Sequence, residues 1–197
     1  MVKLNKIYTR TGDNGTTGLA AGPRRRKDDL RIVACGDIDE ANAAIGMARL
    51  YTLPLMAELD AILARVQNDL FDLGADIATP EFGASLGADL GYEPLRIITT
   101  QVERLEQEID GLNAELQPLN SFILPGGTSL AAHLHLARTI TRRAERAMVA
   151  LVAQEGEQVS DAALHYINRL SDLLFVAGRS ANDQGRVDIL WVPGLNR

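Results

Sequence analysis

Residues 55–78, LMAELDAILARVQNDLFDLGADIA, decide the fold of this 197-residue chain. Apolar side chains recur in it at spacings of 4, 3, 4, 4, 3 and 4, namely at Leu55, Leu59, Ile62, Val66, Leu70, Leu73 and Ile77. This spacing places them all on one face of a helix. Pro80 follows and cannot continue the helix. The stretch therefore predicts a long amphipathic helix over 55–78 that needs other helices to cover its apolar face.

The rest of the chain carries the same periodicity. We expect further helices over about 94–115, 129–154 and 160–183, and a first helix that ends before Pro54. Asp28 or Asp29 can cap the start of this first helix. A start at Asp37 competes, because Gly36 interrupts the earlier pattern. Ser160 is the expected cap of the last helix.

Long amphipathic helices with modest connections are typical of an up-and-down bundle. We therefore expect an all-α fold, a five-helix up-and-down bundle, in a single domain over residues 1–197. Residues 1–27 form a head rich in turn residues, residues 28–184 form the bundle, and residues 185–197 form a short tail. The Gly-rich segment 79–93 is expected to be an irregular surface loop.

Composition excludes several classes of protein. The net charge of −6 argues against a general nucleic-acid binder, and no apolar run reaches the length of a membrane span. No signal peptide is evident, and the single Cys35 fits a reducing compartment, so we expect a cytoplasmic protein. Basic clusters at 24–27 and 142–143 stand out against the acidic background and favour a small anionic ligand.

The strongest local signal in the head is Thr11-Gly12-Asp13-Asn14-Gly15-Thr16-Thr17. Its glycines allow backbone N–H groups to converge on an anion, and its threonines add hydroxyl donors. Lys27 and Arg10 can neutralise phosphate charge. The stretch lacks the usual P-loop pattern. Two interpretations stay open, a phosphate-binding loop and a surface turn that carries threonines.

A second signal lies on the helix expected over 129–154, at Arg138, Arg142, Arg143, Glu145 and Arg146. Three of these, Arg138, Arg142 and Glu145, share one face. Arginine suits phosphate oxygens, and a carboxylate beside it can hold Mg²⁺ or orient the arginine. Taken alone, such a run is more often a salt-bridged, solvated helix face.

Two weaker signals follow. One face of the last expected helix carries Asn168, Asp172, Phe175 and Arg179. Spacing alone favours a structural role for them. Residues 121–128, SFILPGGT, form a rigid entry to the helix over 129–154. By themselves these residues favour a Phe122 that fills the core.

Taken together, these segments resemble the PduO-type ATP:cob(I)alamin adenosyltransferases. The resemblance runs from Lys6 to about Asp183, through KIYTRTGDNGTT, KDDLR, GDIDEAN, SFILPGGT, ARTITRRAERA and YINRLSDLLFVAGR. It implies a five-helix bundle that assembles as a homotrimer, with active sites between subunits. It also implies Mg²⁺-dependent transfer of the 5′-deoxyadenosyl group of ATP to cob(I)alamin, giving adenosylcobalamin and triphosphate.

The same resemblance implies the site residues. For ATP they are Thr9, Arg10, Thr11, Gly12, Asp13, Gly15, Thr16, Thr17, Gly18, Lys27, Arg142, Arg143, Glu145, Arg146 and Asn168. For cobalamin they are Phe122, which lies beneath the corrin ring, with Asp39, Phe175 and Arg179. Asp39 and Arg138 pair across the subunit interface, and Glu145 lies near Mg²⁺. The catalytic set is Arg138, Arg142, Glu145, Asn168 and Phe122.

The implied protein partners are a cobalamin reductase and an adenosylcobalamin-dependent enzyme. Two other readings of the chain compete. A phosphotransferase on the same bundle would release ADP where the adenosyltransferase releases triphosphate. A cobalamin or nucleotide carrier or sensor would bind the same ligands without transfer.

Overall fold

The computed structural model describes residues 7–20, 22–80 and 93–197. Within these ranges the helices are α1 (Leu30–Arg49), α2 (Ala57–Ile77), α4 (Thr99–Ala114), α5 (Ser129–Val152) and α6 (Asp161–Ala181). Two short antiparallel strands, β1 (Thr16–Thr17) and β2 (Arg25–Arg26), form a hairpin in the head. The expected five-helix fold is confirmed, and the hairpin is an addition that the sequence did not indicate.

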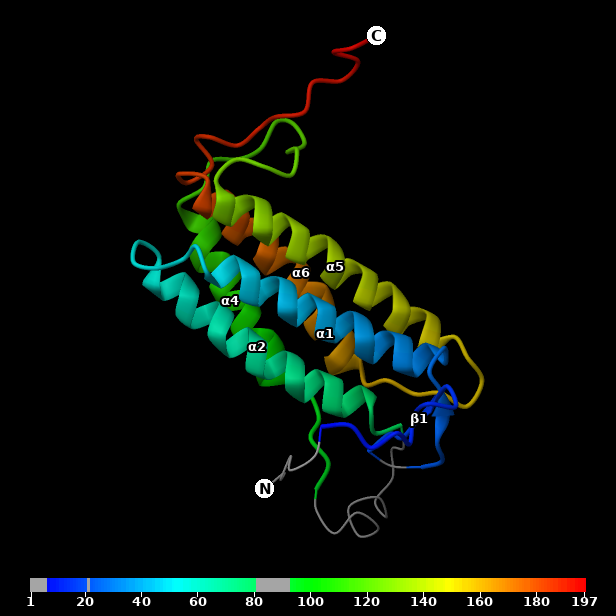
Figure 1. The fold of residues 1–197 in the computed structure, drawn as a ribbon. Coiled ribbons are helices and arrows are strands. Elements are labelled where there is room, and N and C mark those ends of the chain that lie inside the picture. The colour runs from blue at the N-terminus through cyan, green and yellow to red at the C-terminus, as the bar shows by residue number, and fades with distance from the viewer. Residues whose placement is uncertain (1–6, 21, 81–92) are drawn as a thin grey trace.

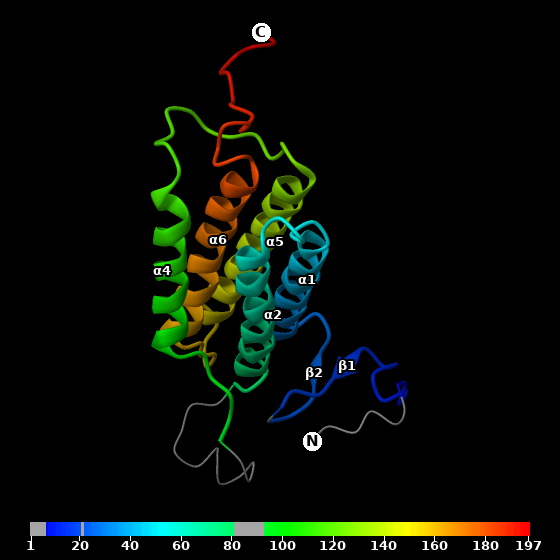
Figure 2. The same ribbon diagram turned by 90° about the vertical axis from the view of Figure 1, so that its left-hand side faces the viewer.

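The helices run alternately up and down the long axis of the molecule (Figures 1 and 2). Helix α1 packs between α2 and α5, and α6 packs between α5 and α4, around a single apolar core. The head lies at the end of the bundle where α1 begins, whereas the C-terminal tail lies at the opposite end (Figure 2). None of the described helices is long and apolar enough to cross a membrane.

Side-chain caps set the starts of three helices. The carboxylate of Asp29 accepts a hydrogen bond of 2.9 Å from the backbone N–H of Arg31, so α1 starts there and the competing start at Asp37 is wrong. Thr128 and Ser160 cap α5 and α6 in the same way. Each cap satisfies a backbone N–H that has no partner within the helix. The predicted cap at Ser160 is confirmed.

Two helix ends differ from expectation. Helix α2 begins at Ala57, so Leu55 precedes it and is 92% exposed, whereas the stripe from Leu59 to Ile77 faces the core. Helix α4 begins at Thr99 because the residues before it are bound to α2 in extended form. The backbone N–H of Ile97 donates to Asp76 over 3.0 Å, which holds this segment out of the helix.

A buried arginine fixes the end of the bundle that carries the head. The guanidinium of Arg31, 1% exposed, donates to the carbonyl of Ile77 at 2.7 Å and to Glu157 at 3.0 Å. Glu157, in the connection between α5 and α6, also accepts from Arg25 of the hairpin. Burial raises the pKa of the Glu157 carboxyl, but the hydrogen bonds from Arg25 and Arg31 outweigh it, so this pKa lies below its ordinary value.

Candidate active site

The loop of the head is closed by its own hydrogen bonds. The guanidinium of Arg24 donates to the carbonyls of Thr11 (2.8 Å) and Thr16 (3.0 Å), and bridges the loop. The backbone N–H of Gly15 donates to Gly12 and that of Lys27 donates to Gly15. The N–H groups of Asp13 and Thr16 are likewise bonded inside the loop, to the carbonyl of Arg10 and the side chain of Asn14. The loop therefore holds its shape without a ligand.

The ammonium group of Lys27 lies directly over this loop. A Cβ atom added to Gly12 would lie 3.2 Å from Nζ of Lys27 and 3.2 Å from the carbonyl oxygen of Thr16, so a larger residue would push the lysine away. The hydroxyls of Thr9 and Thr11, in the same segment of the head, share a hydrogen bond of 2.9 Å. Hydroxyls and a cation therefore lie on the same loop, whereas the backbone N–H groups of Asp13, Gly15 and Thr16 are bonded within it. The phosphate-loop interpretation stays a prediction.

The arginines of the basic cluster at 24–27 support the fold instead. Arg25 contacts Asp29 and Glu157, and Arg26 pairs with Asp28 over 2.7 Å. A carboxylate within the chain therefore meets each of these two guanidinium groups. Lys27 differs from Arg25 and Arg26 because its ammonium group lies over the loop.

Helix packing brings three predicted residues of α5 and α6 together. The amide of Asn168 donates to Oε1 of Glu145 over 2.7 Å. Arg142 reaches Oε2 of the same carboxylate at 4.0 Å, and its side chain remains 49% exposed. Arg146 donates back to the carbonyl of Arg142. The result is a guanidinium, a carboxylate and an amide on one open face of the bundle.

Arg143 points away from this group. Its guanidinium donates to Asp37 over 3.0 Å and also to Glu40, both on α1. These ion pairs join α5 to α1. Arg143 therefore belongs to a salt-bridged helix face, which is the structural interpretation of the basic residues on α5. Arg142 differs from it, because Arg142 lies beside Glu145.

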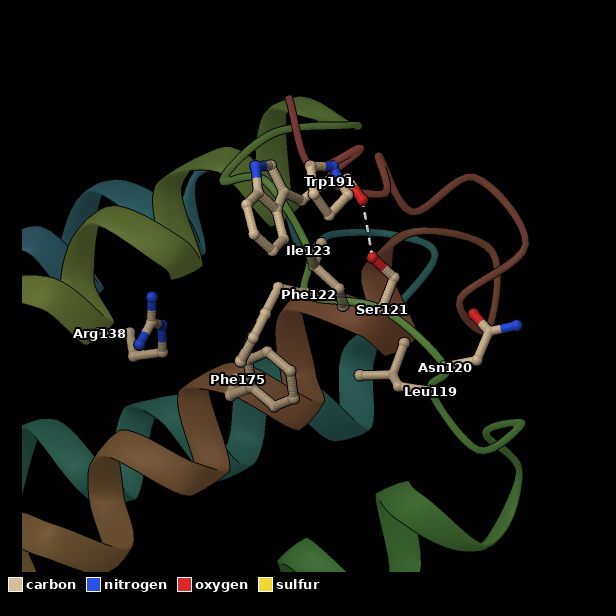
Figure 3. A pocket seen from close by; sticks show the side chains of 9 residues that line it. Leu119, Asn120, Ser121, Phe122, Ile123, Arg138, Phe175 and Trp191 are labelled. Carbon is tan, nitrogen blue, oxygen red and sulfur yellow. Dashed lines mark hydrogen bonds between the residues drawn. The ribbon is translucent and has the colours of Figure 1, made fainter. Parts of the chain in front are cut away.

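A cavity of about 800 Å³ lies at the end of the bundle away from the head (Figure 3). It is lined by Leu119, Asn120, Ser121, Phe122, Ile123, Arg138, Phe175, Trp191 and Pro193. Arg138 and Phe175 extend from α5 and α6 on one side, and Trp191 comes from the C-terminal tail on the other (Figure 3). The walls are mostly apolar, with one cation among them. Such a cavity suits a ligand that combines apolar surface with a few polar groups.

Phe122 is 77% exposed, so the expectation that it fills the core is wrong. The reason is a pairing between its loop and the C-terminal tail. The backbone N–H of Trp191 donates to the carbonyl of Phe122 over 2.8 Å, and Ser121 donates to the carbonyl of Trp191 over 2.7 Å. The two aromatic rings lie with their centroids 6.0 Å apart. The pairing turns Phe122 out of the core toward the cavity.

Trp191 is the cavity residue that the sequence analysis missed. The family resemblance stops near Asp183, before the short tail that carries Trp191. A signal was present, because residues 187–195 are largely apolar and include the only tryptophan of the chain. Such a segment needs a surface to cover. Ile123 and Leu190 form an isolated antiparallel bridge that provides this contact.

Arg138 is electrostatically unsatisfied within the described part of the chain. Its Nε atom is buried and has no hydrogen-bond partner there. Burial, followed by repulsion from Arg142, lowers the pKa of the Arg138 guanidinium below its usual range. Arg138 is half-buried, and a partly buried cation of this kind is stabilised by an anion. Asp39, its predicted partner, is exposed and lines a separate cavity of about 310 Å³ between α1 and α2.

Next to Arg138 lies a buried histidine. Neither ring nitrogen of His135 has a hydrogen-bond partner among the described residues, and the ring packs edge-on against Phe175 with centroids 6.3 Å apart. A Cβ on Gly178 would approach this ring to 3.3 Å, so the glycine makes room for it. Burial and Arg138 lower the pKa of His135, although Asp188 acts in the opposite sense. The ring is therefore held neutral.

The four residues that we expected on one face of α6 have different surroundings in the structure. Asn168 contacts Glu145, Phe175 lines the cavity, and Asp172 is exposed. Arg179 is 6% exposed and pairs with Asp188 over 2.9 Å, while it also donates to the carbonyl of Gln117. Its guanidinium ties the tail to the loop before α5. Arg179 is therefore bonded within the fold and is not among the residues that line the cavity.

The described residues contain no group of three or more His, Cys, Asp or Glu side chains that could hold a metal ion. A Mg²⁺ ion that arrives with a nucleotide needs only one or two protein carboxylates, because phosphate oxygens and water complete its shell. Glu145, 20% exposed beside Arg142, offers one such carboxylate. The site therefore fits a nucleotide-borne Mg²⁺.

Comparison with known proteins places this geometry in a family. Residues 7–181 match the family model described as cobalamin adenosyltransferase. The chain is 50% identical over 196 residues to the corrinoid adenosyltransferase of Mycobacterium tuberculosis, which covers 100% of this chain and 97% of the relative. It is 44% identical over 179 residues to the corrinoid adenosyltransferase of Bacillus subtilis, with coverage of 90% and 86%.

A solved structure gives the same result. A variant PduO-type ATP:corrinoid adenosyltransferase from Lactobacillus reuteri, complexed with cobalamin and ATP, matches with a TM-score of 0.84 and 38% identity. The match covers 95% of this chain and 97% of that one. The sequence motifs, the fold and the two kinds of relative all agree. The chain therefore belongs to the family of PduO-type cobalamin adenosyltransferases.

Proposed function

We propose that the chain transfers the 5′-deoxyadenosyl group of ATP to the cobalt of cob(I)alamin, at sites that form between the subunits of a homotrimer. The observation that carries this proposal is the continuity of two regions along α5. Arg138 lines the large cavity, and one and two turns further on lie Arg142 and Glu145. A corrinoid in the cavity thus lies beside the group suited to a triphosphate.

The cavity supplies what the corrinoid needs. Phe122, Phe175 and Trp191 offer aromatic surface to a macrocycle and exclude water from its cobalt. We place Phe122 beneath the corrin ring, where an apolar side chain keeps the lower axial ligand off the metal. Cobalt without that ligand is easier to reduce to Co(I). A reductase supplies the electron for this reduction.

The open face of α5 and α6 supplies what the nucleotide needs. Arg142 faces the triphosphate as a charged donor, and Glu145 with Asn168 lies near its Mg²⁺, which neutralises phosphate charge when bound. The head adds Lys27 and the hydroxyls of Thr9 and Thr11.

The reaction itself needs alignment more than activation. The electron pair of Co(I) attacks C5′ of the ribose, the Co–C bond forms, and the C5′–O bond breaks with its electrons on the triphosphate. Cob(I)alamin is already a strong nucleophile, so no protein base is required. The protein orients C5′ toward cobalt and stabilises the departing triphosphate.

Two observations support sites between subunits. Arg25 of the head pairs with Asp29, which caps α1, and with Glu157 in the connection between α5 and α6, whereas Arg142 lies in the middle of α5. Arg138 lacks an anion in the described chain, and Asp39 lies exposed on the α1–α2 face. In a ring, Asp39 of one copy can meet Arg138 of the next, and the head of one copy can meet α5 of its neighbour.

An anaerobic assay tests the proposal. Purified chain, MgATP and chemically reduced cob(I)alamin are mixed, and the light-sensitive alkylcobalamin spectrum and triphosphate are followed together. We expect both to appear in equal amounts. Binding of both ligands without transfer would favour a carrier, and release of ADP would favour a phosphotransferase. Absence of cobalamin binding would contradict the assignment of the cavity.

The Phe122→Ala variant tests the role of the aromatic ring. We expect it to bind ATP normally and to use chemically reduced cob(I)alamin, but to turn over slowly when the assay starts from cob(II)alamin and a reductant. The expected split arises because the ring acts on reduction. An equal loss of ATP affinity would show a defect in folding instead.

A further inference from the structure

We propose that Arg169 is a positioning residue for the transfer reaction, which fixes the Asn168 amide that holds Glu145. The inference rests on the function proposed above and adds a residue outside its assigned catalytic and binding set. Arg169 neighbours Asn168 on α6. Three hydrogen bonds join α4, α6 and α5 in one line through these side chains.

The line begins on α4. Nε of Arg169 donates to Oε1 of Glu106 over 2.8 Å, which holds the guanidinium in place. Nη1 of Arg169 then donates to Oδ1 of Asn168, also over 2.8 Å. The Nδ2 group of Asn168 in turn donates to Oε1 of Glu145 over 2.7 Å. Each bond has the length of a well-formed hydrogen bond.

The arrangement determines which end of the Asn168 amide faces Glu145. An amide presents a carbonyl on one side and an NH₂ group on the other, and these recognise opposite partners. Arg169 can only donate, so it selects the carbonyl oxygen and leaves the NH₂ group for Glu145. A carboxylate held in this way has one fixed oxygen, and its other oxygen faces Arg142 at 4.0 Å.

The ion pair between Arg169 and Glu106 has little structural value of its own. Their side chains are 37% and 47% exposed, and exposed pairs of this kind contribute little to stability. The bond from Arg169 to Asn168 lies inward of that pair. Arg169 is therefore placed to act on the site through its bond to Asn168, since its ion pair with Glu106 adds little to stability.

A cycle of variants tests this role, with the rate of triphosphate release from MgATP and cob(I)alamin as the readout. We expect Arg169→Ala to lower kcat about tenfold, as removal of an outer hydrogen-bond partner typically does. Asn168→Ala lowers it further, and the double variant equals Asn168→Ala alone, because Arg169 acts through the amide. We expect Arg169→Lys to recover most of the rate, since an ammonium group still donates to Oδ1.

Arg65→Ala is the matched control. Arg65 also forms an ion pair with α4, through Glu108, but the atoms of this pair lie on α2 and α4. We expect its kcat to equal that of the unmodified chain. Glu106→Gln is a second variant that keeps the fold; it loosens Arg169 and raises the Mg²⁺ concentration needed for half-maximal rate.

The outcomes separate the two claims. No triphosphate from the unmodified chain overturns the proposed function and this inference with it. An active chain whose Arg169→Ala variant keeps its full rate overturns the inference alone. Equal losses from Arg169→Ala in the presence and absence of Asn168 also overturn it, because they show that Arg169 acts by another route.

Discussion

The arginines at the head end of the bundle and those on the α5 face differ in what satisfies their charge. At the head, Arg25 and Arg31 share Glu157, and Arg31 is almost fully buried. On the α5 face, Arg142 has only a 4.0 Å contact with Glu145, and Arg138 has a buried nitrogen without a partner in the described chain. Carboxylates of the chain neutralise the arginines at the head end. We infer that ligand and neighbouring subunit neutralise those on the α5 face.

The difference gives a general way to separate fold from function among charged residues. A cation that is partly removed from water and has no anion beside it costs free energy, and a bound anion offsets that cost. Glu157 and Arg142 are then expected to respond to substitution in opposite ways. The first change should lower stability, and the second should lower activity.

The largest effect is expected from Arg142→Ala. The variant removes a charged donor from the leaving triphosphate, and such a loss lowers kcat/KM by about two to three orders of magnitude. Because the side chain is 49% exposed, the free energy of unfolding should change by less than about 0.5 kcal/mol. Initial rates of triphosphate release and a thermal melt measure the two quantities. Near-normal kcat/KM would remove Arg142 from the site.

Glu157→Gln should give the opposite result. It leaves Arg31 buried without a counter-charge, which costs about 3 kcal/mol of unfolding free energy. Urea unfolding followed by circular dichroism measures this loss. The pKa of Glu157 is lowered in the fold, so the contribution of its charge is present above the unfolded pKa and is lost as pH falls through the folded pKa.

The unfolding free energy of the unmodified chain should therefore fall more steeply than that of Glu157→Gln as pH drops below about 4.3, the ordinary pKa of glutamate. Parallel curves for the two proteins would contradict the assignment of this carboxylate. A matched control is Asp28→Asn, which removes an exposed carboxylate from the same end of the chain. The Arg26 hydrogen bond also lowers the pKa of the Asp28 carboxyl, but this pair is exposed to water, so the curve of Asp28→Asn should depart from that of the unmodified chain far less than the curve of Glu157→Gln does.

A charge swap tests the partner of Arg138. Reversal of Asp39 or Arg138 alone should weaken trimer assembly and lower the transfer rate about tenfold, because two like charges then meet at each interface. The double variant, Asp39→Arg with Arg138→Asp, restores the pair and should recover assembly and activity. Sedimentation velocity and the transfer assay read the two effects. Additive losses in the double variant would show that the residues do not meet.

The smallest effect is expected at His135. Its pKa is lowered in the fold, so the neutral ring adds stability above the unfolded pKa near 6.5, and this stability is lost as pH falls through the folded pKa. His135→Leu should abolish this part of the pH dependence and change the unfolding free energy by about 1 kcal/mol at neutral pH. Denaturant unfolding between pH 5 and 8 measures it. An unchanged slope would contradict the assignment.

Local pattern predicts much of this molecule. The apolar stripe of α2 and the caps at Asp29 and Ser160 follow from the sequence, because helix periodicity and capping involve neighbours within a few residues. The same periodicity places Arg138, Arg142 and Glu145 on one face of α5. Their assignment as site residues comes from the family resemblance and stays a prediction.

Contacts between distant residues could not be predicted in this way. Phe122 turns outward because its loop pairs with Trp191. Glu157 accepts a hydrogen bond from Arg31, which lies 126 positions away in the chain. Neither contact leaves a periodic signal in the sequence. The spacing of Arg179 also matched a site face, yet the residue pairs with Asp188 and does not line the cavity. Helical spacing predicts which face of a helix a side chain lies on, but the residues packed against that face determine what the side chain does.

Subunit mixing tests most directly whether neighbouring copies complete the α5 face. Lys27→Ala damages the head and Arg142→Ala damages α5, so each homotrimer should be nearly inactive. After dissociation and random reassembly of equal amounts, a site with the head of one variant and α5 of the other has both residues intact. We predict recovery of about a quarter of the normal transfer rate, as a heterologous ring allows. No recovery from confirmed mixed trimers would contradict the account, because the site would then lie within one chain.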